Sequence, residues 1–122
     1  MKVIVKRPDE MLHFEEVSGL EEINQIVGNI DENGNGLNHM GSDICDEIFP
    51  GIEMYMKADA LVNADLPKNF WNKKGNKLYF GTIVIVGYIC ANGYHVCSLT
   101  DGQIATLKNH LNELYDIGPI VD

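Results

Sequence analysis

The sequence of 122 residues lacks long hydrophobic runs, and none approaches the roughly 18 to 20 residues that a membrane-spanning helix needs. The first eight residues are too few and too soon charged for a secretion signal. Cysteine is also scarce: Cys45, Cys90 and Cys97 form no Cys-x-x-Cys pair, and an odd number argues against a secreted disulfide scaffold. We therefore expect a cytoplasmic protein with reduced thiols.

Positive charge is missing from a long stretch of the chain. No Lys or Arg lies between Arg7 and Lys57, whereas twelve Asp and Glu residues do. Residues 66–100 show the reverse, with four lysines and no acid. The net charge of -9 opposes nucleic acid or anionic lipid as a direct partner. This distribution predicts one strongly negative region and a smaller positive one.

The common catalytic signatures are absent too. The sequence holds no nucleophile elbow, phosphate loop, dinucleotide fingerprint or His-Glu-x-x-His motif. Its 45% hydrophobic and 22% charged residues are typical of a globular protein, and the length fits one domain. We expect a single domain over residues 1–122 that needs no cofactor and leans away from enzymatic activity.

Capping signals and apolar spacing predict two main helices. Ser18 and Glu21 match a capping box, and the apolar stripe that follows can end at a left-handed Gly28. Thr100 and Gln103 match a second box, which opens a longer helix before Gly118-Pro119. The core-facing stripe of this second helix consists of Ile104, Leu107, Leu111, Leu114 and Tyr115.

Three strands follow from side-chain patterns. Residues 2–6 are β-branched and stop at Arg7-Pro8. Residues 52–57 alternate between apolar and polar side chains, which predicts a half-buried strand. Residues 78–90 are apolar on both strand faces, so we expect a central strand that is covered on both sides.

The remaining segments are harder to interpret from pattern alone. Residues 42–49 carry apolar side chains at helical spacing and predict a short helix before Pro50-Gly51. Residues 66–76 hold Pro, Asn and Gly around Phe70-Trp71, which predicts an ordered loop that these rings anchor.

Asn92-Gly93 is typical of a two-residue hairpin turn. Counting outward from that turn pairs Cys90 with His95 and Tyr88 with Cys97. The four side chains would then share one face, and imidazole and thiolates are the usual soft metal ligands. This face is a candidate ligand-binding site, with ordinary core or edge packing as the alternative.

A polar segment matches half of a calcium-binding loop. Asp31, Asn33 and Asn35 supply oxygen side chains at the first three ligand positions, and Gly36 stands where an EF-hand turns sharply. Ser42 replaces the bidentate Glu at the twelfth position, so the metal site is incomplete. A polar turn explains the same residues.

Short motifs occur in a distinctive order along nearly the whole chain. They are Leu20-Glu21-Glu22-Ile23, Ile26-Val27-Gly28, Gly51-Ile52-Glu53, Val62-Asn63, Leu66-Pro67-Lys68-Asn69, Gly81-Thr82-Ile83-Val84-Ile85-Val86-Gly87 and Ser98-Leu99-Thr100-Asp101-Gly102-Gln103-Ile104. In this order they resemble the domain-of-unknown-function family 3846. The resemblance implies a small accessory protein of a phage, plasmid or conjugative element, without an established activity. Residues 29–50 interrupt the family's pattern and are interpreted as an insertion.

Together these patterns predict an α+β fold: a small mixed or antiparallel sheet, two main amphipathic helices packed on it, and an inserted loop-helix segment. The leading hypothesis is a non-catalytic acidic module that binds a basic surface of a host or element protein. The candidate partner-binding residues are Glu15, Glu16, Glu21, Glu22, Asp43, Asp46 and Glu47. One alternative is a small-molecule or metal-binding module, hydrolytic or not, on the hairpin of residues 83–99. The other is a structural homo-oligomer, such as a homodimer, that pairs through a free strand edge.

Overall fold

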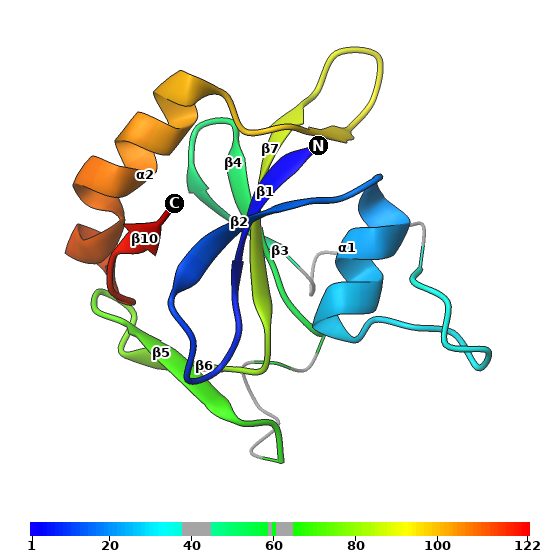
Figure 1. The fold of residues 1–122 in the computed structure, drawn as a ribbon, viewed down its shortest axis with the longest axis horizontal. Coiled ribbons are helices and arrows are strands. Elements are labelled where there is room, and N and C mark those ends of the chain that lie inside the picture. Colours follow the sequence, from blue (N-terminus) through cyan, green and yellow to red (C-terminus); the bar gives the residue numbers. More distant parts are fainter. Residues whose placement is uncertain (38–44, 59, 61–64) are drawn as a thin grey trace.

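The computed structural model describes residues 1–37, 45–58, 60 and 65–122. In this part of the chain, two helices lie on either side of a central group of strands (Figure 1). The elements are β1 (Lys2–Lys6), β2 (Leu12–Glu16), α1 (Leu20–Val27), β3 (Cys45–Phe49), β4 (Ile52–Tyr55), β5 (Lys68–Asn72), β6 (Lys77–Phe80), β7 (Ile83–Ile89), β8 (His95–Cys97), α2 (Asp101–Leu114), β9 (Tyr115–Asp116) and β10 (Ile120–Val121).

The larger sheet has the strand order β10-β2-β1-β7-β4-β3, and β8 also pairs with β7. Most pairs are antiparallel, but β10 runs parallel to β2, which confirms a small mixed sheet. A second sheet among the described residues has the order β6-β5-β9.

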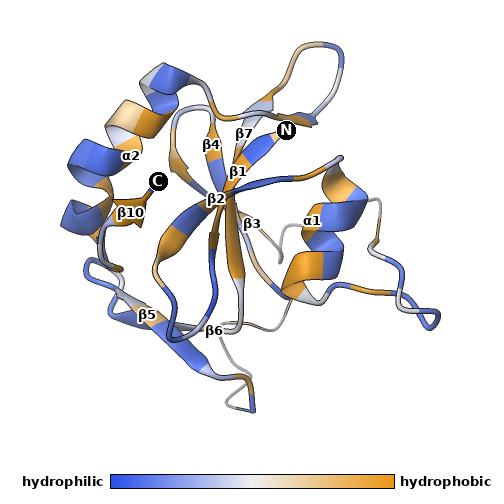
Figure 2. Cartoon of the chain, viewed as in Figure 1, coloured by the Kyte–Doolittle hydropathy of each residue, from blue (hydrophilic) through white to orange (hydrophobic). Residues whose placement is uncertain are grey.

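Strand β7 is central, as its sequence predicts. Ile83 and Ile85 point into one core cluster together with side chains of α2. Val84 and Val86 point into another cluster together with side chains of α1. All four are fully buried, because a helix covers each face of the sheet. Figure 2 shows apolar residues along the central strands and in both helices.

The same two-sided cover corrects the expectation for β4. Alternation predicted a half-buried strand, yet all four residues of β4 are buried. Ile52 and Met54 belong to the α2-side core, and Tyr55 belongs to the α1-side core. Glu53, between them on the strand, is also buried, with 8% of its surface exposed.

Helix α1 forms where the apolar stripe predicts it, but the predicted capping box is wrong. The N-cap residue is Gly19, which has no side chain to offer. Instead, the Glu22 carboxylate accepts a hydrogen bond from the Ser18 amide at 2.8 Å. Gly28 ends the helix in the left-handed conformation, with φ of 99°, as expected.

Helix α2 confirms its capping box. The Thr100 hydroxyl accepts from the Gln103 amide, and the Gln103 side chain accepts from the Thr100 amide. The helix ends at Leu114, four residues before Gly118, because the chain then turns into β9 and pairs with β5.

Two segments differ from their predicted structure. Residues 45–49 form strand β3 rather than part of a helix, since β4 offers an edge on which their backbone can pair. Residues 42–44 of that predicted helix lie outside the described residues. Residues 68–72 form β5 rather than a loop, and of its two rings only Phe70 is an anchor: Phe70 is buried, whereas Trp71 is 47% exposed.

The two-sided burial of β7 predicts an asymmetric response to truncation along this one strand. Ile85→Ala removes a fully buried side chain and leaves a cavity, so it should lower the free energy of unfolding by about 2–5 kcal/mol. Ile89 is 51% exposed on the same strand, and Ile89→Ala should cost about 0.5 kcal/mol or less. Urea unfolding of both variants measures the difference, and equal losses would contradict the assigned burial.

Candidate functional site

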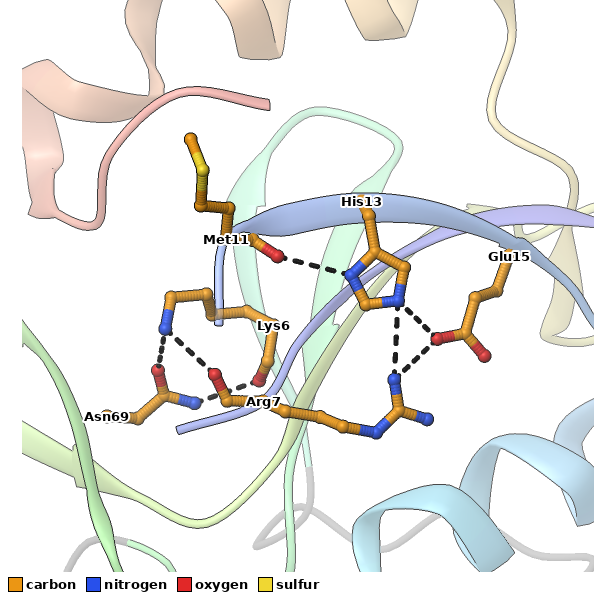
Figure 3. Close-up of polar contacts among 6 residues, drawn as sticks. All are labelled: Lys6, Arg7, Met11, His13, Glu15 and Asn69. Carbon is orange, nitrogen blue, oxygen red and sulfur yellow. Dashed lines mark hydrogen bonds and ion pairs between the residues drawn. The ribbon is translucent and has the colours of Figure 1, made fainter. Parts of the chain in front are cut away.

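The described candidate partner-binding acids lie on three elements: β2 carries Glu15 and Glu16, α1 carries Glu21 and Glu22, and β3 carries Asp46 and Glu47. Glu15 is engaged by Arg7, whose Nη1 donates to Glu15 Oε2 over 2.6 Å, and His13 Nε2 lies 2.6 Å from the same oxygen (Figure 3). The Arg7 hydrogen bond is the main reason why the pKa of Glu15 lies below its usual value, and the contact with His13 adds to this. Glu16 is 78% exposed in its side chain and lies 3.3 Å from the N-terminal amine.

Figure 3 also shows what fixes the Arg7 end of β1. Lys6 Nζ donates to the Asn69 side chain and to the Arg7 carbonyl, at 2.8 and 2.9 Å. The Asn69 amide donates back to the carbonyls of Lys6 and Gly81. Burial lowers the pKa of the Lys6 amine, and the nearby carboxylate of Asp9 acts against this effect. These contacts join β5 to the larger sheet, so the group has a structural role.

Glu21 and Glu22 lie on an open polar cleft between α1 and the turn that follows it. The cleft has a volume of about 550 Å³. Its lining residues are Ser18, Glu21, Glu22, Gln25, Asp31, Asn35, Gly36 and Leu37. Three of these described residues carry carboxylates, and none of them is Lys, Arg or His. The cleft therefore brings two of the predicted acids together with Asp31.

A close backbone approach builds this cleft. A Cβ atom placed on Gly36 would lie 1.7 Å from the Glu21 carbonyl oxygen, so only glycine fits there. The Asn24 side chain also donates to the Leu37 carbonyl at 2.8 Å. The turn is thereby held against α1.

The residues of the half calcium loop lie in that turn. One carboxylate oxygen of Asp31 accepts from the amides of Asn33 and Asn35, at 2.9 and 3.0 Å, and Gly34 has φ of 82°. This is the geometry of a polar Asx-type turn. In the described ranges, no group of three or more His, Cys, Asp and Glu side chains is placed to hold a metal ion.

Asp46 and Glu47 lie on β3, the outermost strand at one end of the larger sheet. Asp46 pairs across from Met54 and Glu47 from Glu53, so their side chains point to opposite faces. The Tyr79 hydroxyl lies 3.5 Å from the Asp46 carboxylate. Asp43, the remaining acid of the predicted set, lies outside the described residues.

The predicted ligand-binding face of the hairpin is wrong in register. Gly87 pairs with Cys97, Tyr88 with Val96 and Ile89 with His95, one step away from the predicted pairing. Asn92 and Gly93 do have positive φ, as the turn signal implies, but five residues rather than two join the strands. A one-residue shift exchanges the faces, so the Tyr88 side chain lies on the other face of the sheet from those of His95 and Cys97. Cys90 is an exposed residue of the connection.

The structure instead assembles a group that the sequence did not reveal. The Tyr94 hydroxyl donates a hydrogen bond to the buried Glu53 carboxylate and lies 2.7 Å from the Tyr55 hydroxyl. The Tyr88 ring stacks on Tyr94, with 5.6 Å between their centroids. We call Glu53, Tyr55, Tyr88 and Tyr94 the Glu53 cluster.

Burial dominates the electrostatics of the Glu53 cluster. It raises the pKa of Tyr94, and the hydrogen bond to Glu53 acts in the same direction because it favours the protonated phenol. Burial and the Glu53 charge raise the pKa of the neighbouring Cys45 thiol to about 12, so this thiol stays protonated and unreactive at neutral pH. One signal pointed to this group: Glu53 interrupts an otherwise apolar strand that pairs with the central strand.

No family model matches the chain, and no curated protein or solved structure is similar enough to match it. The resemblance to the domain-of-unknown-function family 3846 therefore stays a prediction. None of the helices in the described ranges is long and apolar enough to cross a membrane.

The Arg7–Glu15 contact predicts an acid-dependent loss of stability. The contact with Arg7 lowers the pKa of Glu15 in the folded protein. The stabilisation from this contact is therefore fully present above the pKa of an unfolded carboxyl group, about 4.3, and is lost as the pH falls through the lower pKa of the folded protein. Arg7→Gln should therefore be less stable than the native chain at pH 5, by about 0.5–1 kcal/mol. The two should converge near pH 2.5. Urea unfolding at both pH values tests this, and a difference that does not change with pH would contradict it.

The Tyr94 hydrogen bond predicts a cost for removing one hydroxyl. Tyr94→Phe keeps the ring but leaves the buried Glu53 carboxylate without this donor, so the free energy of unfolding should fall by about 1–3 kcal/mol. Tyr88→Phe is the matched control on the stacked partner ring and should cost less. Thermal unfolding of both variants at pH 7 measures the difference. Equal effects would show that the Tyr94 hydroxyl does not stabilise Glu53.

Proposed function

We propose that the chain is a non-catalytic, acidic protein-binding module that binds a basic segment of a host or element protein. The observation that carries this proposal is the cleft beside α1, which Glu21, Glu22 and Asp31 line, and whose described lining residues include no Lys, Arg or His. The chain supplies no Lys or Arg between Arg7 and Lys57, so a partner is the natural source of positive charge. A role as an accessory protein of a mobile genetic element rests on the sequence resemblance alone.

The geometry of the cleft favours a side chain over a metal ion. In the part of the chain that the structure describes, its carboxylates are not placed as metal ligands are, and its volume of about 550 Å³ is far larger than an ion needs. A lysine ammonium or arginine guanidinium can reach several separated carboxylates through charge-assisted hydrogen bonds. Exposed carboxylates of this kind raise the association rate and the specificity more than the affinity, and salt weakens their effect.

Charge reversal in the cleft tests the proposal. We expect Glu21→Lys with Glu22→Lys to weaken binding of a basic partner by at least about tenfold at low salt, because repulsion replaces attraction. The partner is sought by affinity capture from a bacterial host, identified by mass spectrometry and then titrated as a purified protein. Thermal unfolding checks the fold, since acids in the first turn of α1 also favour its dipole by about 0.3–1 kcal/mol each.

Two controls make the result specific. Glu113→Lys with Asp116→Lys makes the same change in net charge on exposed residues outside the cleft lining, and should leave binding within about twofold. Gly36→Ala changes no charge but displaces the turn from α1, and should weaken binding. Equal losses in both charge-reversal variants would show that only net charge matters, and would overturn the assignment of the cleft.

A further inference from the structure

A second, smaller pocket lies at the start of α1, next to the 90–94 connection. It has a volume of about 340 Å³ and is lined by Leu20, Tyr94, His95 and Val96. Leu20 and Val96 are apolar and pack against the α1-side core, and Tyr94 belongs to the Glu53 cluster. The pocket thus combines short apolar walls with an aromatic ring whose hydroxyl contacts a buried carboxylate.

Glu53 makes the environment of this pocket negative. Glu53 is 8% exposed, and its carboxylate contacts the Tyr94 hydroxyl and the Cys45 thiol. Within the described ranges, no ion pair links Glu53 to Lys, Arg or His. A buried charge without an ion-pair partner acts more strongly on its surroundings than an exposed one, because less water screens it.

The aromatic rings near the pocket also favour a cation. Aromatic ring faces attract positive charge, and Tyr88 and Tyr94 form a stacked pair here. The N-terminal end of α1 would favour an anion, but Glu21 and Glu22 in its first turn offset that effect. His95 lines the pocket as an exposed residue.

We propose that this pocket binds a primary ammonium group carried on a short alkyl chain. The alkyl chain packs between Leu20 and Val96, and the ammonium group lies near the Tyr94 ring, on the side where Glu53 supplies negative charge. This inference concerns different residues from the cleft and does not depend on the proposed protein partner.

A pair of small probes tests the charge preference. We expect n-butylammonium to bind roughly 3- to 30-fold more tightly than 1-butanol, a neutral molecule of nearly the same shape. Amide chemical-shift changes in NMR titrations report the affinity and should centre on Leu20, Tyr94, His95 and Val96. Equal affinities, or shifts centred on the cleft residues Asp31 and Asn35, would overturn the proposal.

Isosteric variants identify the source of the preference. Glu53→Gln should reduce the ratio of the two affinities to about one, whereas Glu113→Gln, which removes an exposed carboxylate on α2, should leave the ratio unchanged. If Glu53→Gln does not fold, the comparison of the two probes on the native chain still tests whether the pocket prefers a cation. A ratio that falls equally in both variants would show an effect of net charge and overturn the role of Glu53.

Two peptides test whether the ammonium group belongs to a protein side chain or to a free amine. A blocked Gly-Lys-Gly peptide presents it on a protein side chain, and the same peptide with norleucine is its neutral match. Preferential binding of the lysine peptide supports the proposal with a protein side chain as the source. Binding of butylammonium without the lysine peptide supports it with a free amine as the source. Failure of both cations overturns the proposal and leaves the cleft untouched.

Discussion

The burial of β7 on both faces is the constraint on which the rest of the structure depends. Ile83 and Ile85 need apolar cover on one side, and Val84 and Val86 need it on the other. Burying a side chain of this size contributes about 1.5–3 kcal/mol, so leaving either face in water would remove much of the stability of a small domain. The chain meets this requirement with α2 on one face and α1 on the other (Figure 1).

That constraint also determines where polar chemistry can occur. Because α1 covers the Val84 and Val86 face, the neighbouring Glu53 is enclosed on that face and needs a donor from the chain itself. Tyr94 supplies the donor from the connection after β7. Glu21 on the outer side of α1 and Asp31 in the following turn have no such requirement, and both are exposed to solvent.

The sequence predicted these features unequally. Apolar periodicity identified both helices, a capping box identified the start of α2, and the apolar run identified β7, because these signals are local. The failures are non-local: residues 45–49 become a strand only because β4 offers a free edge, and the hairpin register depends on a five-residue connection. The Glu53 cluster was missed for the same reason, since it needs Tyr94 to reach a residue 41 positions away.

Charge segregation along the sequence becomes meaningful only in the fold. The acidic stretch is divided between acids with an internal partner, such as Glu15, and acids that line the cleft, such as Glu21. The segment around Leu20 then lies between two negative environments, because Ser18, Glu21 and Glu22 line the cleft while Leu20 lines the smaller pocket. We infer that a cation approaching the start of α1 is attracted on both sides, by the cleft carboxylates on one side and by Glu53 on the other.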